Sequence, residues 1–526
     1  MPPWKASSSS SSDDRDVAAT ATPSDRRTAY ARICAARAAG PGGSYLGLGG
    51  DGWRWSGREH ATLVLGPPRS GKTSAVVVPS IAAAPGGVVC TSTKPDIAAV
   101  TAPLRRAMGP VLLFDPTGTV PALPGVERLH WSPVPACMLW DEALVMAGSM
   151  VDAAARAAGG SSRAGDHWTE RAGALLAPLL HAAALQDEDM GTVVAWVDRH
   201  QAGPAQAVLD TAGAVGAGDL LAGITATDER EQSGIWSTAS GVLRAYRGEA
   251  ALAGTRHPLP DVGALVASGG TIYICAAARQ QQAMAPLVVG LLSEVRSAVY
   301  ADAARHTITG SPPSPPVLFA LDEVANIAPI PDLPSMVSEA GGQGLTVLAC
   351  LQDLSQARRR WGTEADGFLS LFGATAVLPG IGDVPTLSAL SALAGDVDVV
   401  HRSVSGPVDG RRRAAATIGR LLLGPGVGRT PPPPSATFST SRRRRLPVDA
   451  IARGRVGSAL VLDERNQPQW IRLTPWFATE PWLGALGPGR QRGTEVPEPP
   501  GPGRSSLEAH GPERGDPGGL GVGFGR

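Results

Sequence analysis

Eight short apolar runs, each bounded by glycine or proline, set the strongest limit on how this chain can fold. Each has the length of a β-strand and is rich in Val, Ile and Leu, and Ala/Leu-rich stretches of helical spacing separate them. Runs that are apolar at every position are typical of parallel strands buried on both faces, because crossover helices cover both sides of the sheet. The pattern therefore predicts an α/β fold. The runs are ATLVLG (61–66), GGVVCTST (86–93), PVLLFDP (110–116), GGTIYICAA (269–277), PPVLFALDE (315–323), GLTVLACLQ (344–352), GATAVLPG (373–380) and GSALVLDE (457–464).

One long interval, 134–262, breaks this alternation. It is Ala/Leu-rich and offers no convincing strand, and Leu175, Leu176, Leu179 and Leu180 recur at helical spacing. We interpret it as an all-α domain inserted into the α/β core. Trp168 in the same interval is read as a core anchor rather than a recognition residue.

The two ends and one late segment differ in composition from the core. Ser, Asp and Arg dominate 1–27, while Gly, Pro, Arg and Glu dominate 483–526, so neither end can bury enough apolar surface to offset the entropy cost of ordering. We expect both tails to be disordered, and we expect the basic, proline-rich segment 402–441 to be a flexible linker. The remaining parts, 28–133, 263–401 and 442–482, would form one α/β domain.

Composition excludes several classes of protein. Of 526 residues, 43% are hydrophobic and the formal net charge is zero, so no bulk field attracts nucleic acid or anionic lipid. The five cysteines are odd in number and form no C-x-x-C pair, which argues against a disulfide framework or a zinc site. We find neither a signal peptide nor an uncharged apolar stretch of about 18 residues. We therefore expect a cytoplasmic protein that reaches the inner face of the cell membrane only through a partner.

The segment after the first run fits the phosphate-binding pattern G-x-x-x-x-G-K-[ST]. Lysine occurs only at positions 5, 72 and 94, and Lys72 stands at the position where a compact ammonium contacts the β- and γ-phosphates. Backbone N–H groups of the loop would cradle the phosphates, and the hydroxyl of Thr73 would bind Mg²⁺. The expected nucleotide-binding residues are Gly66, Pro67, Pro68, Arg69, Ser70, Gly71, Lys72, Thr73 and Ser74.

A second acidic motif and a glutamine complete an ATPase pattern. PPVLFALDE places Asp322 and Glu323 at the end of a buried strand, where Asp322 would hold Mg²⁺ and Glu323 would polarise the attacking water. Gln352 ends the next strand, where its amide would sense the γ-phosphate or would simply close the strand. Lys94 and Asp96 follow another strand end and serve either the nucleotide or a turn.

The order of these motifs resembles the coupling ATPases of conjugative type IV secretion systems, the TraG-like and TraD-like proteins. The resemblance rests on GPPRSGKTS, CTSTKPDI, LLFDP, the long run from LDEVANI to ARRRWG and RLPVDAIARGRVGSALVL, and it covers roughly residues 44 to 478. It implies a RecA-like motor that forms a homo-hexameric ring, hydrolyses ATP with Mg²⁺ and passes single-stranded DNA with its relaxase to the secretion channel. It also implies that the all-α insert reads the relaxosome proteins.

Two features depart from the family pattern. Family members typically begin with a transmembrane segment, which the sequence lacks. They also commonly have an arginine at the position that Gly341 occupies, so the arginine that acts in catalysis is unassigned, with Arg360 and Arg230 as weak candidates. The basic clusters 358–360, 411–413 and 442–445 would either contact the DNA backbone or be solvated surface. A cytoplasmic, ATP-switched interaction protein that moves no DNA is the alternative reading.

Overall fold

The computed structural model describes residues 23–40, 42–159, 163–256, 259–277, 279–405, 418, 421–422, 435–463 and 467–487. Within these residues, twelve strands form one sheet in the order β2-β1-β14-β13-β10-β3-β9-β8-β4-β7-β5-β6. The strands are β1 (Gly42–Gly49), β2 (Gly52–Gly57), β3 (Thr62–Leu65), β4 (Val88–Ser92), β5 (Val111–Phe114), β6 (Glu127–Arg128), β7 (Thr271–Cys275), β8 (Val317–Leu321), β9 (Leu345–Leu351), β10 (Ala374–Val377), β13 (Ser458–Leu462) and β14 (Pro468–Arg472).

All eight apolar runs form strands of this sheet, so the α/β prediction is confirmed. Seven of them pair in parallel, from β10 through β3, β9, β8, β4 and β7 to β5. The eighth, β13, is antiparallel to β10, with Leu460 opposite Val377, so the prediction of parallel pairing is wrong for this strand. Its residues are buried like those of the parallel strands, and burial on both faces carries no information on strand direction.

The central strands separate two hydrophobic cores. Along β3, Leu63 and Leu65 belong to one core and Val64 to the other, because successive side chains of a strand point to opposite faces. The helices α1 (Pro23–Ala39), α2 (Val78–Ala83) and α3 (Asp96–Arg105) pack on the Val64 side. The opposite face carries α12 (Gln281–Thr309), α13 (Val324–Ile327), α14 (Leu333–Glu339), α15 (Leu354–Trp361) and α16 (Phe368–Leu371). The remaining helices of the sheet region are α17 (Val384–Leu393) and α19 (Val448–Arg453).

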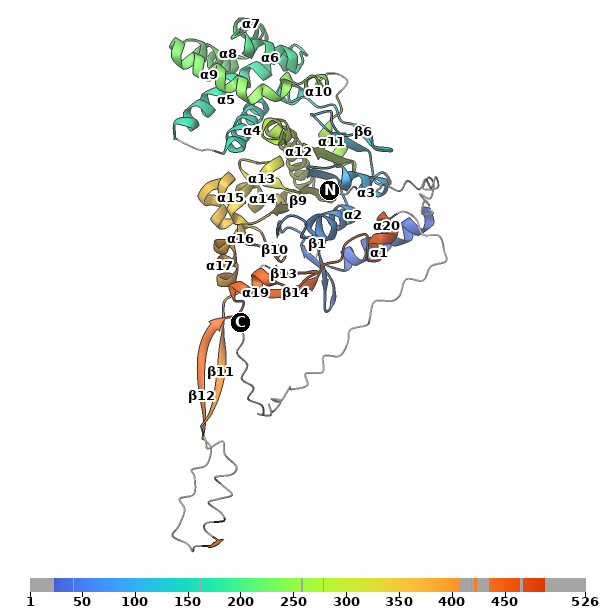
Figure 1. Cartoon of the computed structure of the whole chain (residues 1–526). Coiled ribbons are helices and arrows are strands. Elements are labelled where there is room, and N and C mark those ends of the chain that lie inside the picture. Colours follow the sequence, from blue (N-terminus) through green and yellow to red (C-terminus); the bar gives the residue numbers. More distant parts are fainter. Residues whose placement is uncertain are drawn as a thin grey trace, which may run out of the picture.

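Helices alone occupy the described residues of 134–262, and most of them gather at one end of the molecule (Figure 1). Leu175, Leu176, Leu179 and Leu180 of α5 are completely buried where α4, α7, α8 and α9 pack around it. Because α4 also packs on α12, this unit shares a core with one face of the sheet. The helices are α4 (Trp140–Ala158), α5 (Arg163–Leu185), α6 (Met190–Asp198), α7 (Gly203–Ala212), α8 (Val215–Thr225), α9 (Glu229–Val242), α10 (Glu249–Ala253) and α11 (Val262–Ala267).

Helices lie where the two predicted tails join the core. Helix α1 begins at Pro23 and α20 (Trp482–Leu486) extends past position 482, and the two helices contact each other. Trp482 is fully buried and stacks on Trp53 of β2, with ring centroids 5.1 Å apart. Aromatic burial therefore orders these segments. The rest of both predicted tails, 1–22 and 488–526, lies outside the described residues.

The predicted linker 402–441 is ordered at both ends. Strands β11 (Asp396–Ser405) and β12 (Ser435–Arg444) pair in antiparallel register, and Figure 1 shows this ribbon extending away from the sheet. Asp396 forms ion pairs with Arg444 (3.2 Å) and Arg442 (3.4 Å) across the two strands. These ion pairs flank the predicted linker, and backbone pairing continues into it as far as Ser405 and Ser435. Most residues between the two strands lie outside the described part of the chain.

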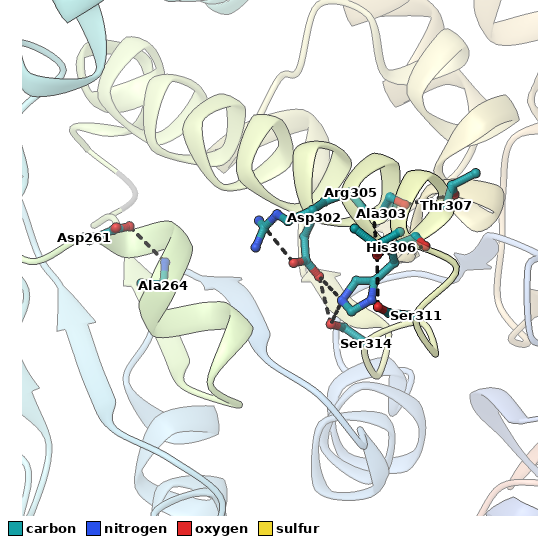
Figure 2. A network of polar contacts seen from close by, with 10 residues as sticks. Asp261, Ala264, Asp302, Ala303, Arg305, His306, Thr307, Ser311 and Ser314 are labelled. Carbon is teal, nitrogen blue, oxygen red and sulfur yellow. Dashed lines mark hydrogen bonds and ion pairs between the residues drawn. The ribbon is translucent and has the colours of Figure 1, made fainter.

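Helix α12 is a core helix that also orders the approach to β8. It is long and apolar enough to cross a membrane, but 61% of its apolar window is buried inside the protein. Near its end, Asp302 Oδ2 accepts a hydrogen bond from Ser314 Oγ at 2.8 Å, and His306 Nε2 lies 3.1 Å from the same hydroxyl (Figure 2). These contacts fix the loop that leads into β8, the strand that ends at the second acidic motif.

Candidate functional site

The glycine-rich loop 66–72 joins β3 to a helical segment at the carboxyl edge of the parallel strands. Gly66 N–H donates to Leu351 O of β9 at 3.2 Å, and Leu378 N–H donates to Leu65 O at 2.8 Å, so neighbouring strands hold the start of the loop. Gly71 has a φ of +98°, a conformation that side chains disfavour. The chain then enters a helical turn, Thr73–Val77, which continues into α2. The loop therefore turns from the strand directly into the start of a helix, which is the backbone arrangement of a phosphate site.

Lys72 lies across this loop. Its Nζ donates hydrogen bonds to the carbonyl oxygens of Gly66 at 2.5 Å and Pro67 at 3.1 Å. The ammonium is therefore held on the concave side of the loop, where a bound phosphate would offer replacement oxygens.

Asp322 follows β8 and Thr73 follows the loop after β3, and their side chains meet although β9 lies between these two strands. Thr73 Oγ1 donates to Asp322 Oδ2 at 3.1 Å, and Thr91 Oγ1 of β4 donates to the backbone oxygen of Asp322 at 3.2 Å. Burial raises the pKa of Asp322 to about 6, with Glu323 adding to the rise and the Thr73 hydrogen bond opposing it. A buried carboxylate beside a hydroxyl is a place where a cation would replace lost hydration.

Glu323 has an unusual backbone conformation. Its φ of 56° and ψ of 47° lie in the left-handed region, which costs a residue with a side chain about 1 to 2 kcal/mol. The residue forms the turn between β8 and α13, and its Oε2 is 3.4 Å from Asn326 Nδ2. Strain of this kind collects at functional sites, where the surrounding structure holds the side chain in place.

These residues surround a cavity of about 540 Å³. The loop from Pro68 to Ser74 forms one side, and Asp322 and Glu323 lie at another. Lys94 and Asp96 also line it while serving the local turn, since Lys94 N–H donates to Ser92 Oγ and Ile97 N–H to Asp96 Oδ1. The cavity further includes Val78, Ser92, Thr93, Ile97, Val100 and Trp476.

The donor set suits a triphosphate with Mg²⁺. The buried hydroxyl of Ser70 has no hydrogen-bond partner within the described protein, so it is available to an oxygen-rich ligand. No cluster of three or more His, Cys, Asp or Glu side chains occurs among the described residues to hold a metal ion unaided. Thr73 and Asp322 supply only two oxygens, which matches Mg²⁺, an ion that completes its shell with waters and phosphate oxygens.

Comparison with known proteins finds conjugative coupling proteins of the same fold. The family model for the TraM recognition site of TraD and TraG matches residues 316–426. The bacterial conjugative coupling protein TrwBdeltaN70 in its unbound monoclinic form is 16% identical, with a TM-score of 0.58 over 79% of this chain and 85% of that chain. The chain is therefore similar to TraD and TraG over the matched residues and to TrwB in fold.

Two further structures of the plasmid coupling protein TrwB agree with this result. The complex with ADP and Mg²⁺ is 16% identical, with a TM-score of 0.57 over 80% of this chain and 85% of that chain. The complex with the non-hydrolysable ATP analogue ADPNP is 17% identical, with a TM-score of 0.57 over 80% and 86% of the two chains. No curated protein matches the sequence. The likeness to TrwB shows a RecA-like P-loop fold.

Gln352 and Trp476 differ most from the sequence-based picture of this site. Gln352 follows β9, and its backbone N–H donates to Gln356 Oε1 at 2.9 Å, but it is not among the residues that line the cavity. Trp476 does line the cavity, although it lies about 400 residues after the loop. No local motif marks Trp476, because only tertiary packing brings it there.

The arginine candidates have clear structural surroundings. A Cβ atom at Gly341 would lie 2.0 Å from Glu59 O, so the fold leaves no room for a side chain at the position where the family resemblance suggested an arginine. Arg360 NH1 donates to the carbonyl oxygens of Arg156 (2.7 Å) and Ala157 (2.8 Å) at the end of α4, which is a capping role. Arg230 is exposed in the first turn of α9.

The other surface candidates are partly neutralised. Arg358 pairs with Asp366 at 2.9 Å, and Arg442 and Arg444 pair with Asp396. The cluster 411–413 lies outside the described residues. Trp168 is half-buried and packs against the core, as expected for an anchor.

Proposed function

We propose that this chain hydrolyses ATP in the presence of Mg²⁺ and uses the energy to move DNA as the coupling protein of a conjugation system. The observation that carries the proposal is the convergence of Lys72, Thr73, Asp322 and Glu323 around one cavity, with Thr73 Oγ1 3.1 Å from Asp322 Oδ2. Residues separated by about 250 positions thus form the two halves of a phosphoryl-transfer site.

Each residue has a distinct proposed role. Lys72 contacts the β- and γ-phosphates, and Thr73 and Asp322 hold Mg²⁺, which neutralises phosphate charge when bound. Glu323 orients and polarises the attacking water from its constrained turn. Gln352 is the proposed residue that senses the γ-phosphate. It follows Leu351, whose carbonyl oxygen accepts a hydrogen bond from Gly66 N–H at the start of the loop.

The DNA-transport part of the proposal draws on the relatives. TrwB is described as a conjugative and plasmid coupling protein, and its structures include complexes with ADP and Mg²⁺, with an ATP analogue and with a GTP analogue. By analogy, the proposed partners are single-stranded DNA, relaxase or relaxosome proteins and a type IV secretion channel or membrane partner. A homo-hexamer is the proposed assembly. The TraM-recognition match over 316–426 favours a contact with relaxosome proteins.

One observation favours a second candidate, a nucleotide-switched interaction protein. The chain has no net charge, and several described arginines of its basic clusters are paired with aspartates, which weakens the case for an extended DNA-binding surface. In that case ATP binding would organise an assembly and DNA would not affect turnover.

DNA-stimulated ATPase activity separates the two candidates. Phosphate release by the full chain is measured with and without single-stranded DNA, for the wild type, Lys72→Ala, Glu323→Gln and the exposed control Glu364→Gln. We expect Lys72→Ala to abolish turnover, Glu323→Gln to keep ATP binding while slowing hydrolysis, and Glu364→Gln to match the wild type. Wild-type turnover in Lys72→Ala contradicts the site, and turnover unaffected by DNA favours the switch.

A further inference from the structure

One wall of the nucleotide cavity is apolar, in contrast to the loop and the acidic motif. Ile97 and Val100 lie one helical turn apart on α3, and Val78 begins α2. With Trp476 they belong to or pack against one hydrophobic core, and they supply an apolar lining to the cavity beside Lys94 and Asp96. Phosphates and Mg²⁺ bind to polar and charged groups, so the apolar wall indicates contact with a different part of the ligand.

The segment that carries Trp476 is fixed in place. Trp476 N–H donates to Ser74 O at 3.0 Å, directly after the Mg²⁺-binding position Thr73. Two residues earlier, Thr474 Oγ1 lies 2.6 Å from the buried hydroxyl of Tyr45. The indole packs against the core beside α2 and α3 and remains partly exposed toward the cavity. The ring is therefore positioned before any ligand binds.

The order of groups in a nucleotide then decides which part reaches this wall. The loop binds the α- and β-phosphates and Lys72 the β- and γ-phosphates, so the sugar and base extend beyond the α-phosphate. An aromatic ring and aliphatic side chains recognise the face of a base by stacking and apolar contact. We propose that Trp476 is the base-stacking residue of the nucleotide site, with Ile97 and Val100 completing the wall. The proposal rests on the proposed function and identifies the ligand as a nucleotide held by its base as well as by its phosphates.

The experiment compares two ligands that differ in the base and sugar. Binding of ATP and of inorganic tripolyphosphate, each with Mg²⁺, is measured by calorimetry for the full-length wild type, Trp476→Ala, Trp476→Phe and Phe438→Ala. Phe438 of β12 is the control, because it is an aromatic residue that is 66% exposed and does not line the cavity. We expect Trp476→Ala to weaken ATP binding by about tenfold and to leave tripolyphosphate binding unchanged. Trp476→Phe should restore most of the ATP affinity, and Phe438→Ala should behave as the wild type.

The contrary results are distinct. Equal loss of ATP and tripolyphosphate binding in Trp476→Ala would show that the residue only braces the loop through Ser74, which overturns the proposal. Unchanged ATP affinity in Trp476→Ala also overturns it while leaving the proposed function intact. If Lys72→Ala keeps the wild-type rate of ATP turnover, the proposed function fails and the base site fails with it.

Discussion

Replacing Gly341 tests whether packing excludes a side chain at the position where the family resemblance suggested an arginine. The residue lies in the turn Ala340–Gln343 before β9, and a Cβ atom built on it would be 2.0 Å from Glu59 O, 2.6 Å from Glu59 C and 2.7 Å from Glu59 Cα. All three are backbone atoms, so no side-chain rotation relieves the clash. The neighbouring Gly342 has open space at the same place, and neither glycine has a left-handed backbone.

Gly341→Ala and Gly342→Ala should therefore change the free energy of unfolding in opposite directions. A backbone shift of about 1 Å is needed to accept Gly341→Ala, which places the cost near the upper end of overpacking, about 3 kcal/mol. Gly342→Ala should stabilise the protein by about 0.5 kcal/mol, because alanine restricts the unfolded chain. With an m value of about 3 kcal/mol/M, the urea midpoint of Gly341→Ala would fall about 1 M below that of Gly342→Ala.

Urea unfolding of the full chain, followed by circular dichroism, measures this difference. ATP turnover is a second readout, since Glu59 lies just before β3 and a shift there would move the phosphate loop. Gly341→Arg should be destabilised at least as strongly and should not speed hydrolysis. Equal midpoints for Gly341→Ala and Gly342→Ala would refute the packing argument.

Two further predictions concern buried charges. Burial raises the pKa of Glu294 from its ordinary value of 4.5 to about 7 in the folded chain. Between these pH values the folded chain holds a proton that the unfolded chain has lost. The free energy of unfolding should therefore fall by about 3 kcal/mol as pH rises from 4.5 through 7. Glu294→Gln keeps an acceptor for Trp131 Nε1, now 2.7 Å from Glu294 Oε2, and urea midpoints should show it more stable than the wild type at pH 8 but not at pH 4.5. Arg360→Ala should lower stability by about 1 to 2 kcal/mol through the lost cap on α4, with phosphate release per folded molecule unchanged. Lost turnover with unchanged stability would instead make Arg360 a catalytic arginine.

The parallel core and the phosphate loop were predictable because local sequence determines them. A buried strand followed by a glycine-rich loop and a helix carries its signal in about 20 consecutive residues, as does the strand that ends in Asp322 and Glu323. The strands β1, β2 and β14 lacked such a signal, since they are rich in glycine or expose alternate residues. Their positions depend on Trp482 and Tyr45, aromatic residues that meet only after the chain has folded.

The ribbon β11–β12 shows that composition alone does not predict strand pairing. Its strands extend into the basic, proline-rich segment 402–441 that was predicted to be a linker, and next to that segment they carry Asp396, Asp398 and Arg442–Arg444. Cross-strand register places Asp396 opposite Arg444 and Asp398 opposite Arg442, and this pairing is visible only once the register is known. Composition describes a segment by itself, whereas strand pairing depends on a partner about 40 residues away.

The cations around the nucleotide cavity indicate whether a single chain or an assembly of chains hydrolyses ATP efficiently. Among the described residues that line the cavity, positive charge comes from Arg69, Lys72 and Lys94. Gly341 has no room for an arginine, and Arg360 is held by carbonyl oxygens at the end of α4. A phosphoryl-transfer transition state spreads charge over its equatorial oxygens, and an arginine supplied from outside the active-site chain commonly accelerates it by about 10³ to 10⁵. Pro68 and Arg69 are exposed at the cavity rim, so a second copy has access to this end of the site. A dilute single chain should therefore bind nucleotide yet turn it over slowly, and the rate per chain should rise with protein concentration as copies assemble.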